Sequence, residues 1–103
     1  MEQLIANIIS EIRGGASVVE IQDDKYSSLV EVTYEEGQSF NLIKLGYVDV
    51  YNLDGELLQD KTFELIEELN KWIESYNKEQ RVKMAEWAEQ KKYEQLGGIY
   101  AYK

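Results

Sequence analysis

The stretch that most constrains the fold is residues 62–96, a third of the chain that contains neither proline nor glycine. It is rich in glutamate, lysine, glutamine, leucine and alanine, which are strong helix formers. Its apolar residues recur every three or four positions, the spacing of one helical face; they are Phe63, Ile66, Leu69, Trp72, Ile73 and Tyr76. These patterns predict a long helix that covers the structure built by the preceding residues.

The apolar face lapses at residues 77–81 and resumes with Met84, Trp87 and Ala88. Two arrangements fit that gap: the chain turns at residues 77–80 and a third helix folds back, or one helix continues beyond the sheet. We favour the turn, because monomeric proteins rarely leave large apolar patches exposed. In the second arrangement, Trp87 is a contact residue and residues 82–96 form the interface of a homodimer or bind a target.

The residues before this helix predict a small sheet. A short helix is expected over residues 1–13, ended by Gly14 and Gly15. Segments of alternating apolar and polar residues predict strands; they are residues 17–22, 28–35, 39–45 and 47–52, with a short addition at 56–59. Tight turns between successive strands make them antiparallel. The mixed pattern of residues 39–45 predicts a central strand buried on both faces.

We therefore predict one α+β domain with a short N-terminal helix and a three- to four-stranded antiparallel meander. One face of the sheet is covered by the long or broken C-terminal helix. Residues 1–76 form the αβ core, and residues 77–103 form a helical extension.

The composition limits the chemistry and the cellular compartment that can be expected for this protein. The chain has 103 residues, no cysteine and no histidine. The first absence excludes disulfides, and the second removes the commonest general base and transition-metal ligand. No apolar run approaches the roughly 20 residues of a membrane span, and the N-terminus lacks the pattern of a signal peptide. We expect a cytoplasmic protein without a membrane partner.

The charge is unevenly distributed along the chain. Residues 1–76 contain 16 acidic and 5 basic residues, whereas residues 77–103 contain 4 and 6. Such an acidic body repels nucleic acid and attracts basic surfaces, so direct binding to DNA or RNA is not expected. Solubility alone is the simpler explanation of the charge.

The sequence contains none of the common catalytic motifs. Nucleophile elbows, phosphate-binding glycine loops and dinucleotide fingerprints are all missing. Asp23 and Asp24, with Glu20 and Glu31 nearby, offer oxygen ligands, but the long ligand run of a calcium loop does not follow them. We expect no enzyme activity, no cofactor and no metal site.

One predicted sheet face carries the clearest functional signal. Alternation places a set of polar and aromatic residues on the face away from the helices; they are Glu20 or its neighbours, Glu31, Thr33, Tyr47, Asp49 and Tyr51. The functional signal is the group of Tyr47, Asp49 and Tyr51 with Glu31. Tyrosine is a common interface anchor, and acidic neighbours complement a surface rich in arginine and lysine. An ordinary solvated sheet face is the alternative.

The layout also resembles a known group of proteins. A short helix (EQLIANIISEI), a three-stranded meander (SVVEIQ, SLVEVTYE, SFNLIKL) and an acidic helix (TFELIEELNKWIESY) resemble phage-encoded anti-CRISPR proteins, in layout most closely the Listeria prophage inhibitors of type II effector nucleases. The resemblance covers residues 2–76 and rests on layout and charge; residues 78–103 depart from it. It implies acidic side chains that imitate DNA in the groove where the nuclease reads its target.

We therefore expect a non-enzymatic inhibitor that blocks a basic nucleic-acid-binding protein, such as a CRISPR effector, by occupying the sites of phosphates. The expected partner-binding residues are Asp23, Asp24, Glu31, Glu35, Glu36, Tyr47, Asp49, Tyr51 and Trp87. One alternative is a structural or assembly protein that self-associates through its C-terminal helix. Another is an immunity or antitoxin protein bound to a basic toxin.

Overall fold

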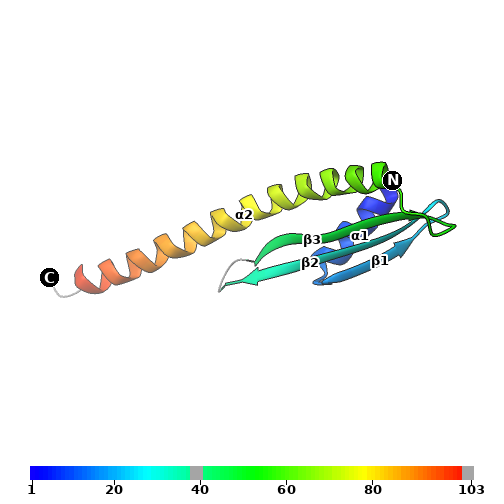
Figure 1. The fold of residues 1–103 in the computed structure, drawn as a ribbon. Coiled ribbons are helices and arrows are strands. Elements are labelled where there is room, and N and C mark those ends of the chain that lie inside the picture. Colours follow the sequence, from blue (N-terminus) through cyan, green and yellow to red (C-terminus); the bar gives the residue numbers. More distant parts are fainter. Residues whose placement is uncertain (38–40, 101–103) are drawn as a thin grey trace.

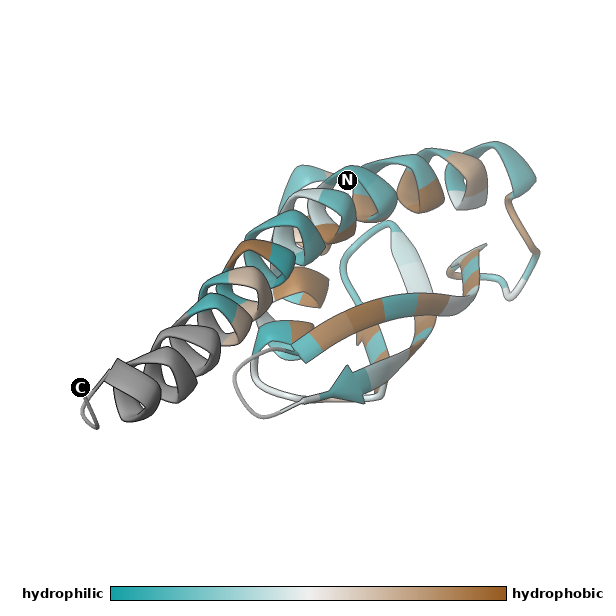
Figure 2. Cartoon of the chain, turned by 90° about the vertical axis from the view of Figure 1, so that its left-hand side faces the viewer, coloured by the Kyte–Doolittle hydropathy of each residue, from teal (hydrophilic) through white to brown (hydrophobic). Residues whose placement is uncertain are grey.

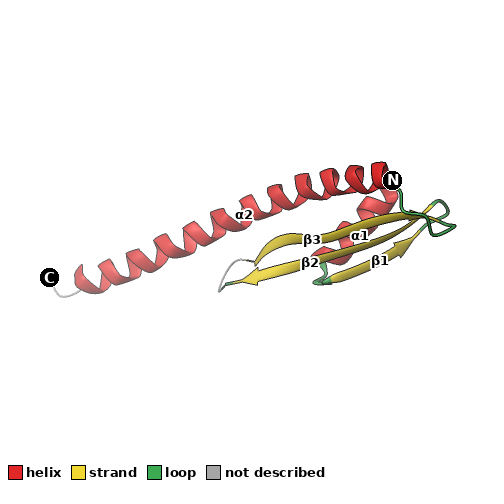
Figure 3. Cartoon of the chain, in the orientation of Figure 1, coloured by secondary structure: helices red, strands yellow, loops and turns green. Residues whose placement is uncertain are grey.

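The computed structural model describes the backbone of residues 1–37 and 41–100 and the side chains of residues 1–37, 41–86, 88 and 89. The chain has the predicted α+β fold (Figure 1). Its elements, in order, are α1 (Glu2–Arg13), β1 (Val18–Gln22), β2 (Tyr26–Glu36), β3 (Asn41–Asn52) and α2 (Gln59–Tyr100). The three strands form one antiparallel meander, and the molecule is elongated, 74 × 19 × 19 Å (Figure 3).

The strand order β1-β2-β3 makes β2 the central strand and β3 an edge. The expectation that residues 39–45 form a central strand is therefore wrong. Residues 41–52 form one strand rather than two, because the extra residue Gly46 is absorbed as a bulge between the pairs Val32–Leu45 and Glu31–Tyr47. A Cβ atom at Gly46 would lie only 3.2 Å from the carbonyl oxygen of Glu31, which explains the glycine.

Both helices pack on the same face of the sheet, where they form a single core (Figure 2). The buried side chains lie at a helical spacing on α1 and α2 and at alternate positions on β2 and β3; they include Leu4, Ile8, Ile12, Leu65, Leu69, Ile73, Val30, Val32, Val48 and Val50. The opposite face of the sheet has no helix against it in the part of the chain that the structure describes (Figure 1).

The helix α2 continues through residues 77–80 without a turn, so the favoured break is wrong. The polar residues there replace apolar packing by hydrogen bonds to the edge of β3. The carboxamide of Asn77 accepts from the Ile43 N–H and donates to the Ile43 C=O, both at 2.8 Å, and Gln80 accepts from the Asn41 N–H at 3.0 Å. Contacts with the sheet thus extend to Gln80, past the expected boundary at residue 76.

The buried face of α2 also differs from the predicted one at its start. Phe63 was expected in the core but is 65% exposed, whereas Leu65 is fully buried. The helix begins at Gln59, and Thr62 fixes its rotation: its hydroxyl accepts from the Val50 N–H at 3.0 Å and donates to the Leu58 C=O at 2.9 Å. Leu65, Leu69 and Ile73 then face the sheet at intervals of one helical turn.

Candidate protein-binding face

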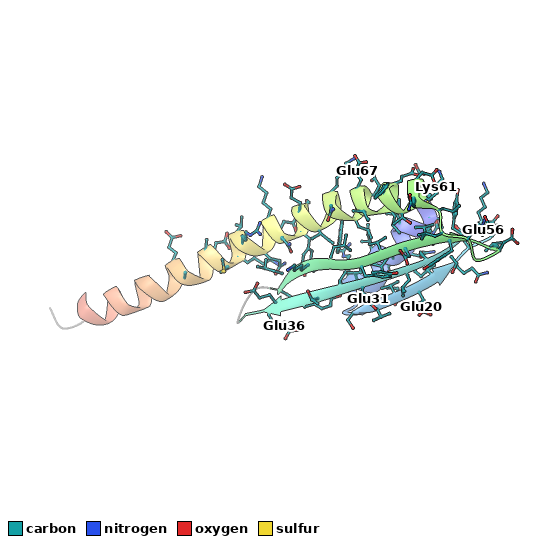
Figure 4. All side chains as sticks on the ribbon, in the orientation of Figure 1. Glu20, Glu31, Glu36, Glu56, Lys61 and Glu67 are labelled. Atoms are coloured by element: carbon teal, nitrogen blue, oxygen red, sulfur yellow. The ribbon has the colours of Figure 1, made fainter. Side chains whose placement is uncertain are left out.

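The acidic face is the surface of the sheet turned away from both helices. We define it by the outward-pointing side chains Glu20, Glu31, Glu35, Tyr47, Asp49 and Tyr51. Strand alternation and the observed register place them on one side, opposite the buried Val19, Val30, Val32, Val48 and Val50. Figure 4 shows Glu20 and Glu31 pointing away from α2.

Three carboxylates of this face surround one apolar residue. Leu29 pairs with Glu20 on one side and with Asp49 on the other, and Glu31 lies two positions further along β2. Diagonal neighbours in a sheet are about 7–8 Å apart, so Glu31 lies at about that distance from both other acids. A flat acidic cluster with an apolar centre results.

Among the described residues, these carboxylates differ from Glu64, Glu67 and Glu68 of α2 in having no salt bridge. The salt bridges among the described residues all lie on α2, where Lys61 pairs with Glu64 at 3.2 Å, and Lys71 lies 3.4 Å from Glu68 and 3.8 Å from Glu67. Lys44, which pairs with Thr33, also lies on this face and is a diagonal neighbour of Glu31 and Glu35, so the negative charge is least compensated around Glu20 and Asp49. The part of the acidic face around Glu20 and Asp49 is therefore better suited to a basic partner than the paired acids at the start of α2.

Asp49 is held between two tyrosines of the same strand. Its Oδ2 atom accepts hydrogen bonds from the hydroxyls of Tyr47 and Tyr51, the second at 2.6 Å. The bond to Asp49 raises the pKa of Tyr47 to about 12, and the same carboxylate raises the pKa of Tyr51. Residues at i, i+2 and i+4 of a strand share a face, so this spacing produces a rigid aromatic patch, with Tyr47 46% exposed.

We expect Asp49→Asn to lower the pKa of Tyr47 from about 12 toward the ordinary value near 10. The raised pKa means that the carboxylate favours the protonated phenol, and a neutral amide removes both the charge and the strong acceptor. NMR titration of ring-labelled tyrosine, assigned with Tyr47→Phe, measures this change. Asp54→Asn, in the turn after β3, is the matched control and should leave Tyr47 unchanged; a Tyr47 pKa near 10 in the wild-type protein would contradict the hydrogen bond.

The structure brings only some of the expected binding residues together. Glu31, Glu35, Tyr47, Asp49 and Tyr51 share the acidic face. Glu20, which alternation suggested for this face but which was not among the expected binding residues, belongs with them. Its position on β1 beside Leu29 is the signal that identifies it, but this signal needs the strand register.

The remaining expected residues lie elsewhere. Asp23 and Asp24 lie in the turn between β1 and β2, whereas Glu36 ends β2 at its far end (Figure 4). Asp23 has a structural role there: its Oδ1 accepts from the Lys25 and Tyr26 N–H groups at 2.8 and 2.6 Å, which lowers its pKa. The side chain of Trp87 lies outside the described residues.

A pocket of about 460 Å³ opens where α2 passes the start of β3 and the end of β2. Its polar lining includes Glu35, Lys44, Asn77 and Arg81, a mixture of charges without a cluster of one sign. Among the described residues, no group of three or more carboxylates is arranged to bind a metal ion. In the same part of the chain, neither helix is apolar over a length sufficient to cross a membrane.

Comparisons with known proteins leave the family open. No protein-family model matches this chain, and no curated protein or solved structure matches it either. The functional argument therefore rests on the acidic face itself.

Proposed function

We propose that this protein is a non-enzymatic inhibitor that binds a basic nucleic-acid-binding protein through the acidic face. The observation that carries the proposal is the grouping of Glu20, Glu31 and Asp49 around Leu29 on a sheet face that no helix covers in the described part of the chain. None of these three acids has a salt bridge within 4 Å among the described residues, unlike Glu64, Glu67 and Glu68 of α2. Carboxylates on a solvated sheet then occupy positions that phosphates take in the partner's groove.

The aromatic patch supports the same proposal. Tyr47 offers a large, half-exposed surface whose hydroxyl is fixed by Asp49, so little conformational entropy is lost when a partner covers it. In this arrangement the acids steer the encounter, and Tyr47 and Tyr51 slow dissociation. A CRISPR effector nuclease is the specific partner that the resemblance to anti-CRISPR proteins suggests, and the host cytoplasm is then the site of action. A basic toxin would be bound by the same chemistry.

The test is capture of a partner followed by competition. The protein is immobilised beside a variant with Glu20, Glu31 and Glu35 changed to glutamine, and proteins retained only by the wild type are identified from a bacterial lysate. Duplex DNA is then titrated against each complex. A basic, nucleic-acid-binding partner released by DNA is expected; a partner that binds DNA and this protein simultaneously would overturn the proposal.

A second candidate function is self-association through the end of α2. About 20 residues of α2 follow Gln80, the last residue bonded to the sheet, and span roughly 30 Å. Val82 and Met84 on this extension are 53% and 36% exposed. These observations favour a helical interface between two copies, as expected for a structural or assembly protein.

If the extension self-associates, Val82→Glu with Met84→Glu should convert a dimer into a monomer without unfolding it, because two buried charges would face each other across the interface. Sedimentation equilibrium measures the mass, and circular dichroism checks the fold. Lys78→Glu with Lys83→Glu is a control made within the same helix. A wild-type protein that remains monomeric at millimolar concentration would exclude this function.

A further inference from the structure

The two edges of the sheet differ in how many of their outward backbone groups are hydrogen-bonded to other parts of the chain. The outward backbone groups of β3 are covered along much of its length. Val50 bonds to Leu58 and Thr62, Asn52 to Glu56, Ile43 to Asn77 and Asn41 to Gln80. Such covering prevents an edge strand from pairing with other chains.

The edge formed by β1 has no comparable cover. The Val32 N–H donates to the Ser17 C=O, and the Asp23 N–H donates to the Tyr26 C=O, so the odd-numbered residues of this segment face β2. By the alternation of an antiparallel ladder, the N–H and C=O groups of Val18, Glu20 and Gln22 point away from the sheet. Among the described residues, no side chain, turn or loop forms a hydrogen bond with these groups.

The sequence of β1 also lacks the usual protection of an edge. It reads VVEIQ, with neither proline nor lysine, and its register with β2 is regular. Val18 is 54% exposed, and Glu20 is exposed on the acidic face. A short, regular and uncovered edge is the type of surface that accepts an added strand.

We propose that β1 binds an extended, basic segment of the partner as a fourth strand of the sheet. This inference rests on the proposed function and specifies how the acidic face is engaged. An added strand places alternate side chains on the acidic face, beside Glu20 and within reach of Glu31, where lysine or arginine is complementary. Its other side chains lie on the side of α1, which packs against β1 and has half-buried Ile5 and Ile9, where apolar residues fit.

A second copy of this chain is a poor occupant of the same edge. Antiparallel pairing of two β1 strands with full overlap is centred on Glu20 and places the two Glu20 side chains directly opposite each other. Like charges in that position destabilise a sheet. Charge complementarity therefore selects a basic segment of another protein.

The probe is a short synthetic peptide that alternates lysine and valine. It is compared with the same peptide N-methylated at two successive central residues, which has the same charge but loses a ladder hydrogen bond whichever of its edges faces β1. We expect the unmodified peptide to slow the solvent exchange of the Val18, Glu20 and Gln22 amides, measured by NMR. N-methylation should weaken binding about tenfold, since one or two backbone hydrogen bonds of about 1 kcal/mol each are lost.

A charge reversal provides the independent variant. Glu20→Lys is exposed and keeps the ladder, so it should fold; it is expected to bind a glutamate–valine peptide in preference to the lysine–valine peptide. Equal binding of the N-methylated peptide, or unprotected Val18, Glu20 and Gln22 amides in the bound state, would overturn strand addition. A captured partner that perturbs Tyr47 and Asp49 but leaves these three amides unprotected would refute the inference while leaving the proposed function intact.

Discussion

Asn77→Leu is expected to lower the free energy of unfolding by about 2–4 kcal/mol, because it leaves both the N–H and the C=O of Ile43 without a partner. Leucine is a better helix former than asparagine, so α2 itself gains from the change. The predicted loss therefore isolates the two hydrogen bonds to β3. It also uncovers the edge of β3, and aggregation should rise with protein concentration.

Urea or thermal unfolding measures this loss, which corresponds to a fall in Tm of roughly 10–25 °C for a domain of this size. Asn77→Asp retains the acceptor for the Ile43 N–H but loses the donor to the carbonyl, so an intermediate loss is expected. Lys78→Leu, at the adjacent exposed position, is the matched control and should change the stability little. Equal stability of Asn77→Leu and the wild type would show that the sheet does not depend on this contact.

Asn77 also shows why sequence patterns predicted the start of the long helix but not its continuation through residues 77–80. Leu65, Leu69, Ile73, Asn77 and Gln80 follow one another at intervals of four or three residues, so the two amides continue the buried face. A pattern based on hydropathy alone registers a gap there and predicts a turn. The hydrogen-bonding needs of an edge strand explain the two amides, but only once β3 is known to be that edge.

The acidic face could also be predicted only in part from the sequence. Alternation alone placed Glu31, Tyr47, Asp49 and Tyr51 on one side, and the structure agrees. The contribution of Glu20 depended on the register of β1 with β2, which the turn at Asp23 fixes through its hydrogen bonds. Glu36 looked equivalent to Glu35 in sequence, but it follows Glu35 at the end of β2, where strand alternation assigns neighbouring side chains to opposite faces.

Removal of charge from the acidic face is the second large effect that we expect. Changing Glu20, Glu31 and Glu35 together to glutamine should slow association with a basic partner about tenfold or more at low salt, because these unpaired acids steer the encounter. The dissociation rate should change less, since Tyr47 and Tyr51 remain in place. Stopped-flow or surface plasmon resonance with the captured partner separates the two rates.

The matched control changes Glu64, Glu67 and Glu68 of α2 to glutamine, which alters the net charge by the same amount. Figure 4 shows Glu67 on the side of the molecule opposite Glu20 and Glu31. If position matters, this control slows association far less than the acidic-face variant. Equal slowing by both sets would indicate attraction by net charge alone, and the acidic face would lose its special role. Both comparisons belong at low ionic strength, because exposed charges are screened within about 10 Å at 0.1 M salt.

The most direct measurement of the central claim is an NMR map of the amides perturbed when the captured partner binds. The acidic-face account predicts perturbation at Glu20, Glu31, Tyr47 and Asp49, with Leu65, Leu69 and Val82 of α2 unchanged. It also predicts that excess duplex DNA abolishes the perturbation by competing for the partner. Perturbation centred on Val82 and Met84, or a map unaffected by DNA, would contradict the acidic face as the binding surface.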